Sequence, residues 1–222
     1  MTEEKKRERT ERVKAMNTIL RRLYPDVAIE LNYSNSWELL VAVILSAQCT
    51  DERVNSVTKD LFKKYKTVQA YANAPQEEME RAVYRCGFYR NKAKNIRSSA
   101  ERILKEFHGE VPHTMEELLT LPGVARKTAN VVLSCAFRIH EGIAVDTHVR
   151  RFVIRFDLSD YTDPVRIERD LVTIMPKKEW WGFNHRLVLY GRYVCKARKH
   201  DCTEHPLTHV YPKANTLWPK AH

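Results

Sequence analysis

Glycine is scarce in this 222-residue sequence, and its cysteines follow no regular framework. It has six glycines and five cysteines, and an odd count without a regular spacing argues against a small secreted protein stapled by disulfides. No apolar run is long enough to cross a membrane, and residues 1–12 are too charged for a secretory signal. We therefore expect a protein of a reducing compartment that has no membrane span.

Charged and helix-forming residues are abundant. Lys and Arg number 38 against 28 Asp and Glu, which gives a net charge of +10. An excess of basic residues suits a polyanionic partner, although charged surfaces are often simply solvated. Many Leu, Ala, Glu, Lys and Arg residues with few glycines favour a mostly helical protein. The length allows one domain or two small ones with a proper core.

The most informative segment is Leu-Pro-Gly-Val-Ala-Arg-Lys-Thr-Ala-Asn at residues 121–130. A capping box at residues 114–117 predicts the start of a helix, and Pro122 followed by Gly123 predicts its end. Apolar spacing predicts a second helix over residues 128–137. Backbone N–H groups at such a turn and helix start can bind a phosphate. The segment is therefore a candidate clamp for nucleic acid.

Lys127 falls in the predicted first turn of this second helix. The helix dipole and the neighbouring Arg126 both disfavour an ammonium group there, which favours the free amine. An amine with a carboxylate such as Asp146 suits attack on a sugar carbon and Schiff-base chemistry. Surface lysines are common, so the residues alone also allow a merely solvated lysine.

Four segments together resemble the endonuclease III family of DNA glycosylases. The segments are residues 46–51, 121–131, 145–148 and 191–195, and they follow one another along the chain in the same order as in the family. The resemblance extends from about Arg21 to Cys202 and implies an all-α fold of two helical lobes. A central, barrel-like lobe over residues 28–139 would carry a helix-hairpin-helix at residues 114–139. Both termini, residues 1–27 and 140–222, would form the second lobe, with a degenerate cluster loop.

The resemblance also implies an enzyme of base-excision DNA repair. Such an enzyme is a bifunctional N-glycosylase that removes oxidised pyrimidines and cuts the abasic site by β-elimination through a lysine Schiff base. Lys127 would attack C1′ of the sugar, and Asp146 would stabilise the positive charge that develops there. Relatives that remove mispaired adenine lack this lysine, so its presence favours glycosylase plus AP lyase activity. The alternative is a non-catalytic DNA-binding protein that uses the hairpin as a clamp.

Other residues are assigned to DNA by the same resemblance. Gln48 matches a glutamine that fills the gap left by the extruded nucleotide, although a polar residue there is often a cap. Phe88 is the candidate wedge into the base stack, where the family often has leucine; composition alone allows a core contact equally well. The remaining expected DNA contacts are Gly123, Ala125 (often glycine in the family), Arg126, His148 and Lys196.

The C-terminal cysteines fit the family only in part. Endonuclease III proteins commonly end in C-x6-C-x2-C-x5-C, whose four thiolates hold a [4Fe–4S] cluster. Cys195 and Cys202 match, but His205 and Tyr211 occupy the third and fourth positions. We therefore predict no iron–sulfur cluster and no cofactor, with this loop as a metal-free relic. Zinc held by Cys195, Cys202, His205 and His209 is the minor alternative, disfavoured by the long first gap.

The expected partner is double-stranded DNA with a damaged pyrimidine or an abasic site. We expect the protein to bind it as a monomer and to have no membrane contact. If the source is prokaryotic, the expected location is the cytoplasm, at the nucleoid. A eukaryotic source would leave the location open, because the basic N-terminus could then act in organelle targeting.

Overall fold

The computed structural model describes residues 1–218 and is all-helical over that range, as the sequence predicts. It contains eleven α-helices, four 3₁₀ turns and one π-helix, and the described part of the chain has no β-strand. Contacts divide the chain into two units, Ile29–Glu141 and Met1–Ala28 with Gly142–His222. None of the described helices is long and apolar enough to cross a membrane.

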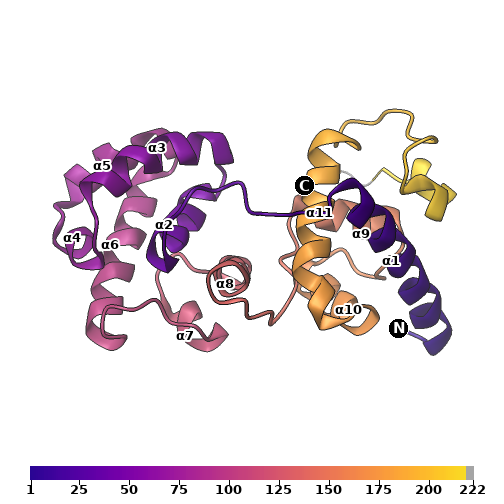
Figure 1. The fold of residues 1–222 in the computed structure, drawn as a ribbon, viewed down its shortest axis with the longest axis horizontal. Helices are drawn as coiled ribbons and strands as arrows, with labels where there is room; N and C mark the ends of the chain where they lie inside the picture. The colour runs from indigo at the N-terminus through magenta and orange to yellow at the C-terminus, as the bar shows by residue number, and fades with distance from the viewer. Residues whose placement is uncertain (219–222) are drawn as a thin grey trace. The chain divides into compact units, whose positions relative to one another are not determined.

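The unit Ile29–Glu141 is built around a helix that is apolar on all sides. This helix, α2, buries Trp37 and every residue from Leu39 to Leu45, which is the pattern of an interior helix. Helices α3, α6 and α8 pack against it (Figure 1). The helices of the unit are α2 (Ser36–Ser46), α3 (Asp51–Lys64), α4 (Val68–Asn73), α5 (Gln76–Val83), α6 (Tyr89–Glu106), α7 (Met115–Thr120) and α8 (Arg126–Val132), with η1 (Tyr84–Cys86) and the π-helix η2 (Leu133–Phe137).

The other unit joins the first helix to the last third of the chain. Its helix α11 packs against α9 and α1, and α1 also packs against α10. Buried aromatic and aliphatic side chains such as Phe152, Phe183 and Leu187 fill the space between them. Its helices are α1 (Glu3–Leu23), α9 (Thr147–Arg155), α10 (Pro164–Ile174) and α11 (Trp180–Tyr193), with η3 (Lys177–Glu179), η4 (Thr208–Val210) and η5 (Pro212–Asn215).

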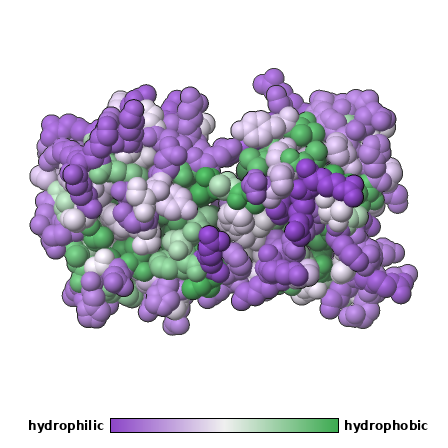
Figure 2. Space-filling view, viewed as in Figure 1, coloured by the Kyte–Doolittle hydropathy of each residue, from purple (hydrophilic) through white to green (hydrophobic). Residues whose placement is uncertain are grey.

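Two predicted boundaries differ from the structure. The second hairpin helix begins at Arg126 instead of 128 and continues after Val132 as a π-helix. Gly123 reverses the chain early, with φ +78°, so that the extended residue Ala125 already serves as the N-cap. Helix α6 begins at Tyr89, directly after its left-handed N-cap residue Phe88. Hydrophilic residues cover much of the visible surface of each unit (Figure 2).

Candidate functional site

The predicted hairpin is held by backbone geometry that only glycine meets easily. Helix α7 starts at the capping box, where Thr114 Oγ1 accepts from the Glu117 N–H at 3.3 Å. The N–H of Val124 donates to the Leu121 carbonyl at 3.1 Å and closes the turn. A Cβ on Gly123 would lie 2.6 Å from the Asn95 amide nitrogen, and its φ of +78° is left-handed. The turn is therefore fixed in shape against α6.

Lys127 is exposed in the first turn of α8. The N-cap residue, Ala125, offers no side-chain cap, so the first N–H groups of this helix are not satisfied by a capping oxygen. Within residues 1–218, the Lys127 ammonium makes no hydrogen bond or ion pair with another side chain. Lys127 is thus an accessible amine in the first turn of a helix, and a nucleophile has to be accessible.

Asp146 is the N-cap of α9 in the other unit. One carboxylate oxygen, Oδ1, accepts the N–H of Val149 at 2.8 Å, so the cap uses only one of the two oxygens. The side chain is half-buried. His148, two residues along, faces Gly191 of α11, where an added Cβ would lie 2.5 Å from the histidine Nδ1. The missing side chain at Gly191 leaves the room in which His148 packs.

Gln48 and Phe88 both occupy left-handed turns in the unit Ile29–Glu141. Gln48 has φ +52° and lies exposed between α2 and α3, and Phe88 has φ +45° and is 65% exposed. Non-glycine residues with positive φ are uncommon and concentrate at functional sites. The exposure of Phe88 excludes the core contact that composition alone allowed.

A buried lysine that sequence reasoning missed joins these two turns. The Lys92 Nζ donates to the carbonyl of Leu45, at the end of α2, at 2.9 Å, and to the carbonyl of Cys86. Leu45 lies shortly before Gln48, and Cys86 shortly before Phe88. Burial lowers the pKa of Lys92, an effect that Cys49 and Cys86 oppose. No sequence signal separates this lysine from the solvated lysines of the same helix.

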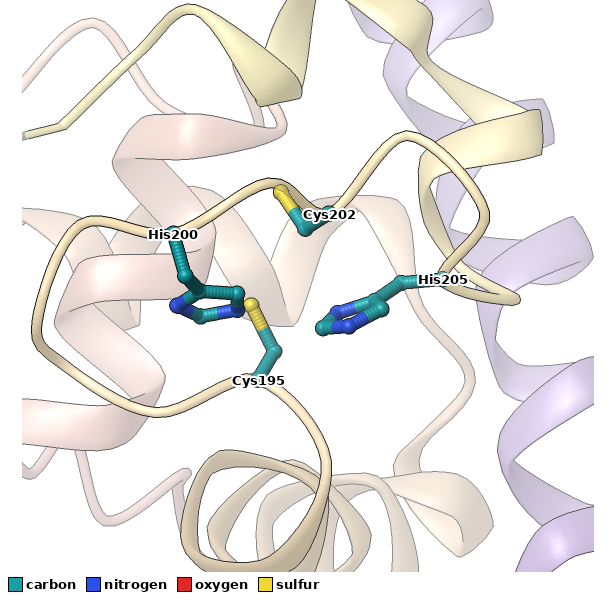
Figure 3. Close-up of side chains that lie close together, drawn as sticks. All are labelled: Cys195, His200, Cys202 and His205. Atoms are coloured by element: carbon teal, nitrogen blue, oxygen red, sulfur yellow. The ribbon is translucent and has the colours of Figure 1, made fainter.

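The loop after α11 gathers four potential metal ligands. Ligand atoms of Cys195, His200, Cys202 and His205 all lie within 4.8 Å of one another, and Figure 3 shows these side chains close together on one loop. Both cysteines are buried and unpaired. Burial raises the pKa of the Cys195 thiol, and the guanidinium of Arg155 opposes that rise. Lys196 lies exposed in the same loop, and its carbonyl accepts from Arg151 at 3.1 Å.

Comparison with known proteins gives the family. Residues 41–177 match the "HhH-GPD superfamily base excision DNA repair protein" family. Endonuclease III of Synechocystis sp. is 53% identical over 88% of this chain and 90% of its own length. Endonuclease III of Bacillus subtilis is 48% identical over 83% of this chain and 84% of its own length. The chain belongs to the endonuclease III family.

Solved endonuclease III structures agree with this assignment. A non-covalent endonuclease III–DNA complex superposes with a TM-score of 0.88, at 43% identity over 93% of this chain and 97% of that one. A trapped endonuclease III–DNA covalent intermediate gives the same values. Membership of a family of glycosylases with AP lyase activity sets aside the non-catalytic clamp.

The prediction of a cofactor-free loop is wrong. Proteins of the endonuclease III family commonly hold a [4Fe–4S] cluster at this place, and the structure gathers a Cys/His ligand set at residues 195–205. The residues present do not fit that cluster well, because they supply two thiolates instead of four. The gathered residues also differ from those of the zinc alternative. His209 is exposed and outside the ligand set, whereas His200 belongs to it.

Proposed function

We propose that Lys127 and Asp146 carry the reaction of this endonuclease III family member. The chain is a base-excision repair enzyme, a DNA glycosylase with AP lyase activity that acts on oxidised pyrimidines in duplex DNA. The observation that carries the residue assignment is the exposed Lys127, unpaired among the described side chains, in the first turn of α8 directly after the Gly123 turn. The trapped covalent intermediate of a 43% identical endonuclease III supports a nucleophile that bonds to DNA.

The chemistry begins with extrusion of the damaged nucleotide from the stack. The free amine of Lys127 attacks C1′, and the C1′–N bond to the base breaks, with the electron pair leaving on the base. Loss of the amine proton and ring opening give a Schiff base between Nζ and C1′. This iminium acidifies the C2′ proton, so its removal expels the 3′ phosphate by β-elimination. Hydrolysis of the imine then returns the amine.

Asp146 is suited to charge stabilisation instead of nucleophilic attack. Its Oδ1 is engaged by the N-cap hydrogen bond to Val149, which fixes the carboxylate in one orientation. The other oxygen is not used by the cap. A carboxylate so placed stabilises the positive charge that grows on the sugar and accepts protons as the imine forms.

The proposed DNA contacts fall into two sets, one acting on the base stack and one binding phosphates. Gln48 would fill the gap left by the extruded nucleotide, and Phe88 would wedge into the stack beside it. Their left-handed turns and the exposure of Phe88 support these roles. Phosphates would be held by the backbone amides of Gly123 and Ala125 and by the basic side chains of Arg126, His148 and Lys196. Because its substrate is genomic duplex DNA, the enzyme would act at the nucleoid in the cytoplasm if the source is a prokaryote.

Borohydride trapping tests the assignment. The parent protein, mixed with duplex DNA that carries an abasic site, should form a covalent adduct once the Schiff base is reduced. Lys127→Ala should form no adduct and should lose strand cleavage by at least about a hundredfold. Lys105→Ala, which removes another exposed lysine of the same unit, is the matched control and should behave as the parent. Full strand cleavage by Lys127→Ala would refute the mechanism.

A further inference from the structure

The loop between α11 and η4 places two thiols and two imidazoles where one ion can contact all four. We propose that this chain binds a single Zn²⁺ ion through Cys195, His200, Cys202 and His205. The pattern C-x4-H-x-C-x2-H is not the four-cysteine motif of the family, so the proposal concerns this chain's own residues. It does not depend on the role of Lys127, and its test reads metal content instead of activity.

The spacing of the donor atoms suits a single ion. All four lie within 4.8 Å of one another. Tetrahedral zinc, with bonds of about 2.3 Å to sulfur and 2.0 Å to nitrogen, holds neighbouring ligand atoms roughly 3.3 to 3.8 Å apart. A contraction of about an ångström, within the freedom of side-chain rotation, completes such a site. A cluster of four irons needs four thiolates spread around a cube, and here the fourth family position is Tyr211, whose ring lies under the Arg12 guanidinium.

The two histidines present nitrogen atoms that lack any other partner. The Nδ1 of His200 lies 2.7 Å from the carbonyl oxygen of Arg198 and must donate to it, which leaves the lone pair on Nε2. That Nε2 is buried without a hydrogen-bond partner, and so is the Nδ1 of His205. Two orphaned nitrogens in one cluster are costly unless something satisfies them. A backbone carbonyl on one ring nitrogen with a metal on the other is the usual arrangement for ligating histidine.

A buried arginine orients both sulfurs. Arg155, at the end of α9, is fully buried, and its Nη1 and Nη2 donate to the Sγ atoms of Cys195 and Cys202 at 2.9 Å each. The same guanidinium donates to the Ala214 carbonyl at 2.7 and 3.1 Å, so its position is fixed. Hydrogen bonds from a second layer of residues orient the side chains that bind a metal ion. Cys202 Sγ also lies 3.1 Å from Asn215 Oδ1, a contact that a thiol makes and a zinc-bound thiolate would give up.

Four protein ligands would close the coordination sphere, which is typical of a structural zinc ion. The ion would tie an irregular loop to α9 through Arg155 and thereby hold Lys196 and the other exposed basic residues of the loop in place. Metal affinity would then contribute directly to the stability of this unit, since the unfolded loop has no preformed site.

Metal analysis of the full chain tests the proposal. The protein should be expressed with both iron and zinc supplied and purified without oxygen, so that a labile cluster would survive. We expect about one zinc per chain and no stoichiometric iron or acid-labile sulfide. His200→Ala and His205→Ala should each lose most of the zinc. His209→Ala, which removes the exposed histidine of the same loop, should keep it.

Cobalt substitution guards against a variant that fails to fold. Parent protein stripped of metal and given Co²⁺ should show the intense visible bands of a tetrahedral ion and an ultraviolet thiolate-to-cobalt band, and Zn²⁺ should displace both. Iron and sulfide in stoichiometric amounts would overturn the proposal in favour of a cluster. Protein that takes up neither zinc nor cobalt, or zinc retained equally by the His200→Ala, His205→Ala and His209→Ala variants, would overturn it as well.

Discussion

At the scale of single residues, Lys92 shows how one buried cation can position two functional turns. Its ammonium is almost fully shielded from water, and its acceptors are the carbonyls of Leu45 and Cys86. A buried charge is tolerated only when hydrogen bonds replace its hydration. These two bonds tie the end of α2 to η1, and so fix the relative places of the Gln48 and Phe88 turns within the unit.

We expect Lys92→Met to lower the free energy of unfolding by about 2 to 4 kcal/mol. Methionine fills the space of the lysine stem but leaves two buried carbonyls without a donor, each at about 1 to 3 kcal/mol. Urea denaturation followed by circular dichroism measures the effect. Lys94→Met, on the exposed face of the same helix, should change stability by less than about 0.5 kcal/mol. Equal free energies of unfolding for the two variants would show that the hydrogen bonds of Lys92 do not stabilise the fold.

Residue roles differed in how far the sequence could predict them. Lys127 and Gly123 stand in a motif whose spacing already implies a turn and a helix start. His200 could not be predicted from the family spacing, which points to positions 205 and 211, because its place among the ligands is seen only in contacts with residues distant in the sequence. The His200 ring packs against Trp218 with centroids 5.1 Å apart, a contact that no local pattern encodes.

At the scale of elements, α1 is fastened to the segment after α9 by charge as well as by its apolar face. Arg9 is 1% exposed, and its Nη2 donates to Asp157 and Asp160 at 2.8 Å each. Lys5 is a second cation paired with Asp160, at 2.9 Å. Hydrogen bonds from Arg9 and then Lys5 hold the pKa of Asp160 well below its ordinary value.

The depressed pKa makes this contact sensitive to acid. An aspartate whose folded-state pKa lies below its unfolded value of about 3.9 contributes stability above that pH, and loses the contribution as pH falls toward the folded pKa. Asp160→Asn should therefore cost about 1 kcal/mol at pH 7, a modest value because the carboxylate is 40% exposed. Below about pH 4 the urea midpoints of the parent and the variant should begin to converge, and the difference should shrink further as the pH falls toward the folded pKa.

Asp60→Asn is the matched control for this pH series. Asp60 is exposed on α3 and has no ion pair with another residue of the 1–218 range. Its difference from the parent should stay small at every pH. A gap between parent and Asp160→Asn that persists undiminished at pH 3 would contradict the linkage argument.

Element positions were predictable where local chemistry dictates them. The capping box at Thr114, the N-cap of α10 at Asp163 and the uniformly apolar α2 each follow from a few adjacent residues. The π-helix η2 could not be predicted, because no pattern in residues 133–137 distinguishes it from a continuation of the α-helix. There the Leu133 N–H is shared between the Ala129 and Asn130 carbonyls.

At the scale of the whole molecule, the net charge of +10 sets how the protein meets duplex DNA. Neutralising phosphates releases counterions, so affinity falls with salt in proportion to the number of phosphates contacted. A catalytically silent background is needed to measure this, and Lys127→Ala supplies one because it should bind without turnover. Its affinity for a duplex carrying an abasic site should fall steeply as salt rises, which fluorescence anisotropy can follow.

Adding Lys196→Ala to that background should reduce the salt slope by about one, since each phosphate contact contributes about 0.9 to the slope. Lys196 is exposed, and its own carbonyl is anchored by Arg151, so loss of its side chain should leave the loop in place. Lys105→Ala in the same background removes an equal charge outside the proposed DNA contacts and should leave the slope unchanged. Equal losses of affinity in both double variants, with no change of slope in either, would contradict a phosphate contact by Lys196. The positive net charge of the protein would then attract DNA only as a long-range electrostatic field.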